Sequence, residues 1–142
     1  MANVVCEISV TKAPLVAGSD LAGAGAVIDF WGVVRPIEDG REIEGIDYEA
    51  HYEMAEHQLK RIVEQAAERF ELKRVIVQHR TGFIAVGEAS LFLRVASPHR
   101  REGFQASQWI VDELKKKVPI WKRPAFAKAT AGKPSLVRIL AK

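Results

Sequence analysis

The feature that most constrains the fold of this chain is an apolar stripe between residues 54 and 70. The side chains that form it recur at i, i+3, i+4, i+7 and i+11, and they are Leu59, Ile62, Val63, Ala66 and Phe70. This spacing places them on one face of a helix. An amphipathic helix must bury that face against a second layer of structure.

The flanking segments supply that layer, because they alternate between apolar and polar residues as strands do. The segments that predict strands are 4–10, 25–34, 43–52, 73–80 and 88–96, followed by an extended segment at 120–126 and a short strand at 135–140. Residues 13–24, 36–40 and 81–87 predict loops. We expect 43–52 to pair antiparallel with 25–34, and Gly32 to mark a bulge or a close approach.

A second helix is predicted from its boundaries. Ser97 and Pro98 are typical of an N-cap and a first helical residue, and Pro119 ends the helix after about Lys117. Two helices against antiparallel strands predict an α+β fold. The length of 142 residues predicts a single domain over 1–142.

The end of that helix carries an unusual segment, residues 114–123, in which five of ten residues are Lys or Arg. Val118, Ile120 and Trp121 within it favour burial, so we expect the segment to be held against the protein. Its lysines are then either a solvated helix end or one wall of an anion-binding site. Lys115 follows Val111 by one turn and lies at the edge of the apolar face.

The distribution of charge favours an anionic ligand. Nine Lys or Arg and no Asp or Glu occur from residue 115 to residue 142. A phosphorylated small molecule, an acidic protein or nucleic acid would each suit this charge.

Cys6 is the only cysteine, which excludes an internal disulfide, and it is expected to be a buried strand residue. We find neither a signal peptide nor an apolar run long enough to span a membrane, and we expect a cytoplasmic protein.

Three further residues are candidates for binding an anion. His99 and Arg100 open the second helix, where backbone N–H groups attract anions and cations are otherwise unfavourable. Alternatively, Arg100 pairs with surface carboxylates and His99 only caps the helix. Arg35 ends an apolar strand and is either a ligand contact at the sheet edge or a surface arginine.

The sequence offers no nucleophile of its own. It has no Gly-x-Ser-x-Gly motif, no phosphate loop and no metal-ligand spacing among its four histidines. This pattern is typical of a site that stabilises negative charge while the reactive group comes from elsewhere.

An ordered set of short motifs resembles the catalytic (large) subunit of molybdopterin synthase, the MoaE family. The motifs are Phe30-x-Gly32-x-Val34-Arg35, Tyr48-Glu49-Ala50-x-Tyr52-x-Met54-Ala55, His79-Arg80-x-Gly82, Val86-Gly87-Glu88, His99-Arg100, Phe104-x-Ala106 and Leu114-Lys115 through Pro119-Ile120-Trp121-Lys122. The resemblance covers roughly residues 25–123 and rests on the order of the set.

The resemblance implies an α/β-hammerhead fold and a sulfurtransferase without a metal or a cofactor. It implies a homodimer in which each copy binds a ubiquitin-like small subunit, giving a heterotetramer. The small subunit carries sulfur as a C-terminal thiocarboxylate. The implied substrate is cyclic pyranopterin monophosphate (precursor Z), which receives two sulfurs to become the dithiolene of molybdopterin. No nucleic acid and no membrane take part.

The resemblance also assigns roles to residues. Lys115 and Lys122 match the catalytic lysines, with Lys115 suited to proton transfer or to the acyl group of the tail and Lys122 to charge stabilisation. The residues that match the substrate-binding site are Arg35, His99, Arg100 and, near the tail, Phe30. The other protomer of the dimer is the expected source of His99 and Arg100.

Two features depart from the family pattern and motivate an alternative. Arg123-Pro124-Ala125 stands where family members commonly carry an acidic residue, and residues 127–142 are basic. A non-catalytic homologue that binds the ubiquitin-like partner or a pterin phosphate is the alternative function. A nucleic-acid-binding domain is a third hypothesis, but the pattern shows no exposed aromatic platform for stacking bases.

Overall fold

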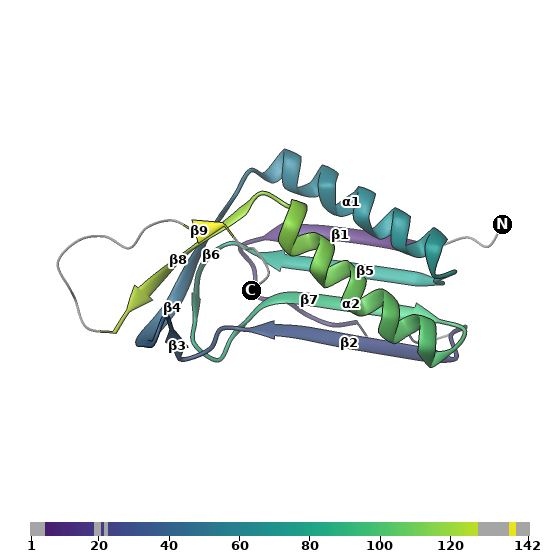
Figure 1. Ribbon diagram of the computed structural model, residues 1–142, viewed down its shortest axis with the longest axis horizontal. Helices are drawn as coiled ribbons and strands as arrows, with labels where there is room; N and C mark the ends of the chain where they lie inside the picture. Colours follow the sequence, from purple (N-terminus) through teal and green to yellow (C-terminus); the bar gives the residue numbers. More distant parts are fainter. Residues whose placement is uncertain (1–4, 19–20, 22, 128–136, 139–142) are drawn as a thin grey trace.

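A computed structural model describes residues 5–18, 21, 23–127 and 137–138 of the chain (Figure 1). The elements in chain order are β1 (Val5–Thr11), β2 (Ala26–Val33), β3 (Ile37–Glu38), β4 (Arg41–Ala50), α1 (Tyr52–Arg69), β5 (Arg74–Arg80), β6 (Gly82–Ala85), β7 (Ala89–Ser97), α2 (Arg100–Lys117), β8 (Ile120–Phe126) and β9 (Val137–Arg138). Two helices and two sheets confirm the predicted α+β class.

The first sheet has the strand order β1-β5-β7-β2. Its β1–β5 pair is parallel, whereas β5–β7 and β7–β2 are antiparallel. Both helices pack on one face of this sheet, α1 over β1 and β5, and α2 over β7 and β2 (Figure 1).

The second sheet has the strand order β3-β4-β8-β9, with β6 also paired to β4, and all of its pairs are antiparallel. It stands at the end of the molecule where α2 finishes, on the left in Figure 1. The start of α2 lies at the far end. This arrangement decides which candidate residues can meet.

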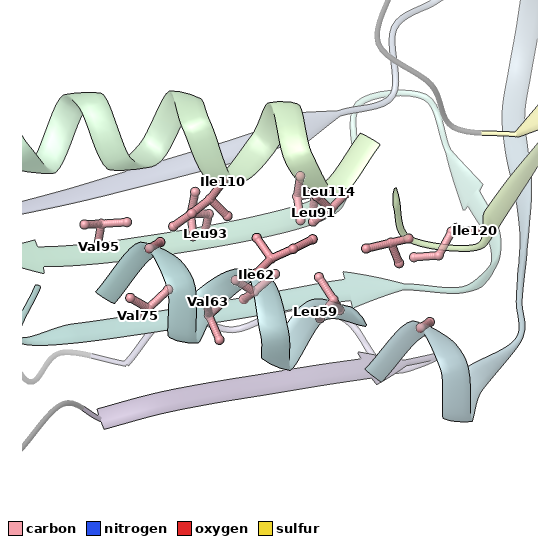
Figure 2. Close-up of a cluster of buried hydrophobic side chains, with 14 of the residues drawn as sticks. Leu59, Ile62, Val63, Val75, Leu91, Leu93, Val95, Ile110, Leu114 and Ile120 are labelled. Atoms are coloured by element: carbon pink, nitrogen blue, oxygen red, sulfur yellow. The ribbon is translucent and has the colours of Figure 1, made fainter. Parts of the chain in front are cut away.

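The core fills the space between the helices and the first sheet. In Figure 2, Ile62 and Val63 of α1, Ile110 of α2 and Leu93 of β7 lie in one cluster of side chains, and all four are at most 2% exposed. Ile120 extends the same apolar cluster to the first residue of β8. The predicted stripe is therefore the buried face of α1, except that Phe70 is the C-cap just after the helix and is only partly buried.

Several local predictions are confirmed. The β2–β7 register shifts between Gly32 and Val33, which is the expected bulge. Residues 114–123 are anchored by Leu114, Val118 and Ile120, each at most 2% exposed. Neither α1 nor α2, the helices in the described part of the chain, is long and apolar enough to cross a membrane.

The predicted pairing of 43–52 with 25–34 is wrong. β2 pairs with β7 and forms the outer edge of the first sheet, while β4 joins the second sheet. The reason is the turn at Asp39 and Gly40, whose φ angles of 52° and 73° suit a two-residue hairpin loop. That turn pairs β4 with β3, inside the segment predicted to be a loop.

Four smaller expectations also need correction. β6 forms within the predicted loop 81–87, and the β1–β5 pair is parallel rather than antiparallel. The N-cap of α2 is His99 rather than Ser97, because Ser97 Oγ donates to the His99 carbonyl oxygen at 2.6 Å. Cys6 is exposed, since it lies near the start of the edge strand β1. Of the strand predicted at 135–140, residues 137–138 form β9 and the others lie outside the described residues.

Candidate functional site

Lys122 lies in the middle of the second sheet, on β8 opposite Tyr48 of β4. Its Nζ donates a hydrogen bond of 2.7 Å to Glu38 Oε1. The lysine side chain is 20% exposed and the glutamate only 5%. The lysine head is therefore fixed by a buried carboxylate while part of the side chain still meets solvent.

Arg35 approaches the same carboxylate from the loop that follows β2. Its Nη2 atom lies 3.9 Å from Glu38 Oε2, and its side chain is 72% exposed. This distance is too long for a hydrogen bond, so Arg35 is held loosely. The structure thus brings two predicted site residues, Arg35 and Lys122, to the two oxygens of one carboxylate.

Lys115 is placed at the same end of the molecule by the last turn of α2. It is partly buried next to the buried Leu114, whereas Lys116 and Lys117 are more than half exposed. Lys116 and Lys117 pair with Glu113 at 3.9 and 2.7 Å, as expected for a solvated helix end. Among the described residues Lys115 makes no ion pair, which leaves its ammonium group available to an anion.

Phe30 lies on β2, in register with Leu93 of β7. It is 37% exposed, and its neighbours Trp31 and Val33 are 39% and 50% exposed. A Cβ at Gly32 would lie only 3.2 Å from Leu91 Cβ, so the glycine permits the close approach of β2 to β7 beside Phe30. Phe30 is thus an accessible aromatic group on the strand that leads to Arg35.

His99 and Arg100 lie at the opposite end of α2 from Lys115. With a rise of 1.5 Å per residue, the helix separates Arg100 from Lys115 by roughly 22 Å along its axis. One copy of the chain therefore does not bring all six predicted site residues together.

A surface hollow of about 500 Å³ opens beside this end of α2. The residues that line it are Arg69, Phe70, Glu71, Pro98, His99, Glu102 and Gln105. His99 Nδ1 lies 3.7 Å from Glu102 Oε2, and the His99 side chain does not cap the helix. The His99 side chain therefore accepts no hydrogen bond from the N–H groups in the first turn of α2. An anion bound at this position would need those N–H groups as donors.

Two buried titratable groups, Tyr48 and His79, lie near Lys122, since Tyr48 is its neighbour on β4. The ring of Tyr48 meets that of His79 edge-on at 5.4 Å. Burial lowers the pKa of His79 to about 4, so the imidazole is neutral, and its Nδ1 bonds to the Arg80 carbonyl oxygen at 2.8 Å. Burial, with a further contribution from the charge of Glu38, raises the pKa of Tyr48. Both groups are uncharged at neutral pH, and the charge in this region resides on Glu38 and its cations.

Glu38 is the site residue that the sequence reasoning missed. The signal that could have found it is Asp39-Gly40, the dipeptide most typical of a tight hairpin, directly after the glutamate. A hairpin there would have placed Glu38 on a strand rather than in a solvated loop.

No group of three or more His, Cys, Asp or Glu side chains in the described residues is arranged to hold a metal ion.

Comparison with known proteins places this geometry in context. The family model described as MoaE protein matches residues 6–117. A molybdopterin synthase catalytic subunit from Pyrococcus abyssi is 43% identical over 102 residues, which cover 72% of this chain and 69% of that protein. A protein of the same name from Thermoplasma volcanium is 39% identical over 100 residues, covering 70% and 73%.

Solved structures agree in fold. Molybdopterin synthase from Staphylococcus aureus superposes with a TM-score of 0.71 at 30% identity, over 78% of this chain and 79% of that one. A complex of subunits 1 and 2 of molybdopterin-converting factor from Helicobacter pylori has a TM-score of 0.61 at 21% identity, over 74% and 73%. At that lower identity only the fold is carried over.

Proposed function

The chain belongs to the MoaE family, and from this premise we propose that it is the catalytic subunit of a molybdopterin synthase. The reaction is the transfer of sulfur from the thiocarboxylated C-terminus of a ubiquitin-like small subunit to cyclic pyranopterin monophosphate. The observation that carries the proposal is the match over residues 6–117, which takes in every candidate residue except Lys122.

The chemistry assigned to this chain is mainly charge stabilisation, and the first attack on the substrate is not made by one of its own side chains. The sulfur nucleophile arrives on the partner's tail, so the chain needs to hold two anions, the tail and the substrate phosphate. Lys122 and Arg35 around Glu38, and Lys115 at the nearby end of α2, are suited to this role. Lys115 is the candidate for proton transfer or for receiving the acyl group of the tail.

The remaining substrate contacts come from a second copy of the chain in this proposal. His99 and Arg100 are too far from Lys115 along α2 to share a site with it in one copy. A homodimer that places the start of one α2 near the end of the other would complete each site. With one small subunit bound to each copy, the assembly is a heterotetramer.

Phe30 is proposed to contact the tail or the pterin, because it is an exposed aromatic residue on the strand leading to Arg35. We also propose that residues 1–142 form one domain and that the protein works in the cytoplasm. A single cysteine is consistent with a reducing compartment.

The test is a single-turnover reaction of the purified chain with thiocarboxylated small subunit and cyclic pyranopterin monophosphate. Formation of the dithiolene is expected, at the expense of the thiocarboxylate. The same partner as a plain carboxylate is the control, because it binds but carries no sulfur. Binding of the partner without any product would refute the enzymatic function and favour the non-catalytic homologue.

A further inference from the structure

Glu38 is a buried carboxylate inside the cationic site, and none of the roles described so far uses it. It is 5% exposed, and each of its oxygens faces a different cation. Oε1 accepts the hydrogen bond of 2.7 Å from Lys122, and Oε2 lies 3.9 Å from Arg35. The fold brings Glu38 and Lys122 together across 84 residues of sequence.

The position of Glu38 is set by the hairpin of β3 and β4. The turn at Asp39 and Gly40 closes that hairpin and pairs Glu38 with Arg41. The register of β4 against β8 shifts between Ile43 and Gly45, and a bulge of this kind bends a strand. The ion pair with Lys122 shows that the end of the hairpin reaches β8, and the turn fixes the backbone of Glu38 at that place.

The two cations are not equivalent partners of Glu38. Arg35 is mostly in water and beyond hydrogen-bond range, so it restrains the carboxylate weakly. Lys122 is four-fifths buried and directly bonded, and a carboxylate taken this far out of water requires such a partner. The restraint therefore acts mainly between Glu38 and Lys122.

An ammonium group has three N–H donors, and the bond to Glu38 uses one of them. This hydrogen bond restrains the position of the ammonium group, and the other two N–H donors remain to bind a second acceptor. Without this hydrogen bond, the long side chain of Lys122 would sample many rotamers. Binding would then cost the conformational entropy of fixing one of them.

We propose that Glu38 is a positioning residue for sulfur transfer, which holds the Lys122 ammonium group in place without touching the substrate. The inference rests on the proposed function, since it deepens the role given to Lys122. It predicts that Glu38 acts through Lys122 alone.

The experiment is a double-mutant cycle measured in the single-turnover reaction with saturating substrate. Glu38→Gln keeps the shape of the side chain and removes its charge, and it is expected to lower the rate about tenfold or more. Lys122→Gln lowers the rate at least as far. The double variant is expected to match Lys122→Gln, because Glu38 has nothing left to position.

Glu42→Gln is the matched control, because Glu42 is an exposed glutamate on the neighbouring strand of the same hairpin. It is expected to keep the wild-type rate within about twofold. The proposal would be overturned if the rate of the double variant fell by the product of the two single-variant factors. A Glu38→Gln rate close to that of the wild type would also overturn it. A wild-type chain that forms no product would instead overturn the proposed function.

A second measurement is independent of activity. Nitrogen-15 spectra of the lysine ammonium groups, recorded on the wild-type chain, are expected to show a slowly exchanging signal from Lys122. That signal should disappear in Glu38→Gln and persist in Glu42→Gln. A Lys122 signal that exchanges as fast in the wild-type chain as those of Lys116 and Lys117 would overturn the positioning role, even if Glu38→Gln did not fold.

Discussion

At the scale of single residues, burial and the available partners together decide which groups carry charge. His79 is 2% exposed and its pKa is lowered to about 4, while Glu38 remains beside Lys122 and Arg35 as a paired carboxylate. The fold thus keeps a neutral imidazole against Tyr48, the cross-strand neighbour of Lys122.

The lowered pKa of His79 makes stability depend on pH. The unfolded chain binds a proton at His79 below about pH 6.5, whereas the folded chain resists it until about pH 4. Stability from this group is therefore full above pH 6.5 and is lost as the pH falls toward 4. We expect a loss on the order of 2 kcal/mol between pH 7 and pH 4.5, measured by denaturant unfolding.

His79→Asn is the control for that effect, because its amide can replace the Nδ1 donor to the Arg80 carbonyl oxygen and does not titrate. Its stability should fall by less over the same interval. An equal fall in both proteins would show that other groups cause the acid sensitivity.

The role proposed for Lys115 is also a statement about one residue. Lys115→Ala is expected to lower the single-turnover rate by roughly a hundredfold or more, as for loss of a group that moves a proton. Lys116→Ala is the matched control on the same turn, since Lys116 is 63% exposed and paired with Glu113. Thermal unfolding of both variants checks that the fold is intact. Near-normal turnover by Lys115→Ala would remove it from the mechanism.

At the scale of elements, the sequence predicts helices better than strand partners. Leu59, Ile62 and Val63 reveal α1 because a helix makes its own hydrogen bonds and needs only one apolar face. The partner of β4 depended instead on the turn at Asp39 and Gly40. β3 and β6 span two and four residues, which is too short for alternation to identify them.

The candidate site was predictable to a similar extent. Arg35 and Lys122 could be proposed from motifs, because charge and residue type are visible in a sequence. Asp39-Gly40 could have placed Glu38 on a strand, but its contact with Lys122 could not be foreseen, because that contact joins residues 84 apart in the sequence. The Ser97 cap signature misled for a related reason, since its hydroxyl bonds to the His99 carbonyl oxygen instead.

A substitution at Gly45 tests how closely β4 and β6 pack against each other. A Cβ at this position would lie 2.5 Å from the Ile84 carbonyl oxygen, a backbone atom that cannot rotate away. Gly45→Ala is therefore expected to destabilise the fold by about 1–3 kcal/mol. Gly18→Ala is the control, because a Cβ there meets nothing within 4 Å. Equal denaturation midpoints for the two variants would contradict this account of the second sheet.

At the scale of the whole molecule, the candidate residues are divided between the two ends of α2. Lys115 lies in the last turn of α2, at the end nearer the second sheet, and His99 and Arg100 lie at its start. Lys122 and Arg35 meet at Glu38. β2 forms an edge of the first sheet with exposed apolar residues, a feature that proteins usually cover. A site completed by a second copy accounts for both observations.

The most direct test of this account is a mixed assembly of Lys115→Ala and Arg100→Ala chains, each with a different affinity tag. Each variant alone is expected to be inactive, because every site lacks one residue. The purified mixed dimer with small subunit bound should recover about half the wild-type activity, since one of its two sites is intact. A mixed assembly no more active than either variant alone, or a chain that forms no mixed assembly, would contradict a site shared between two copies.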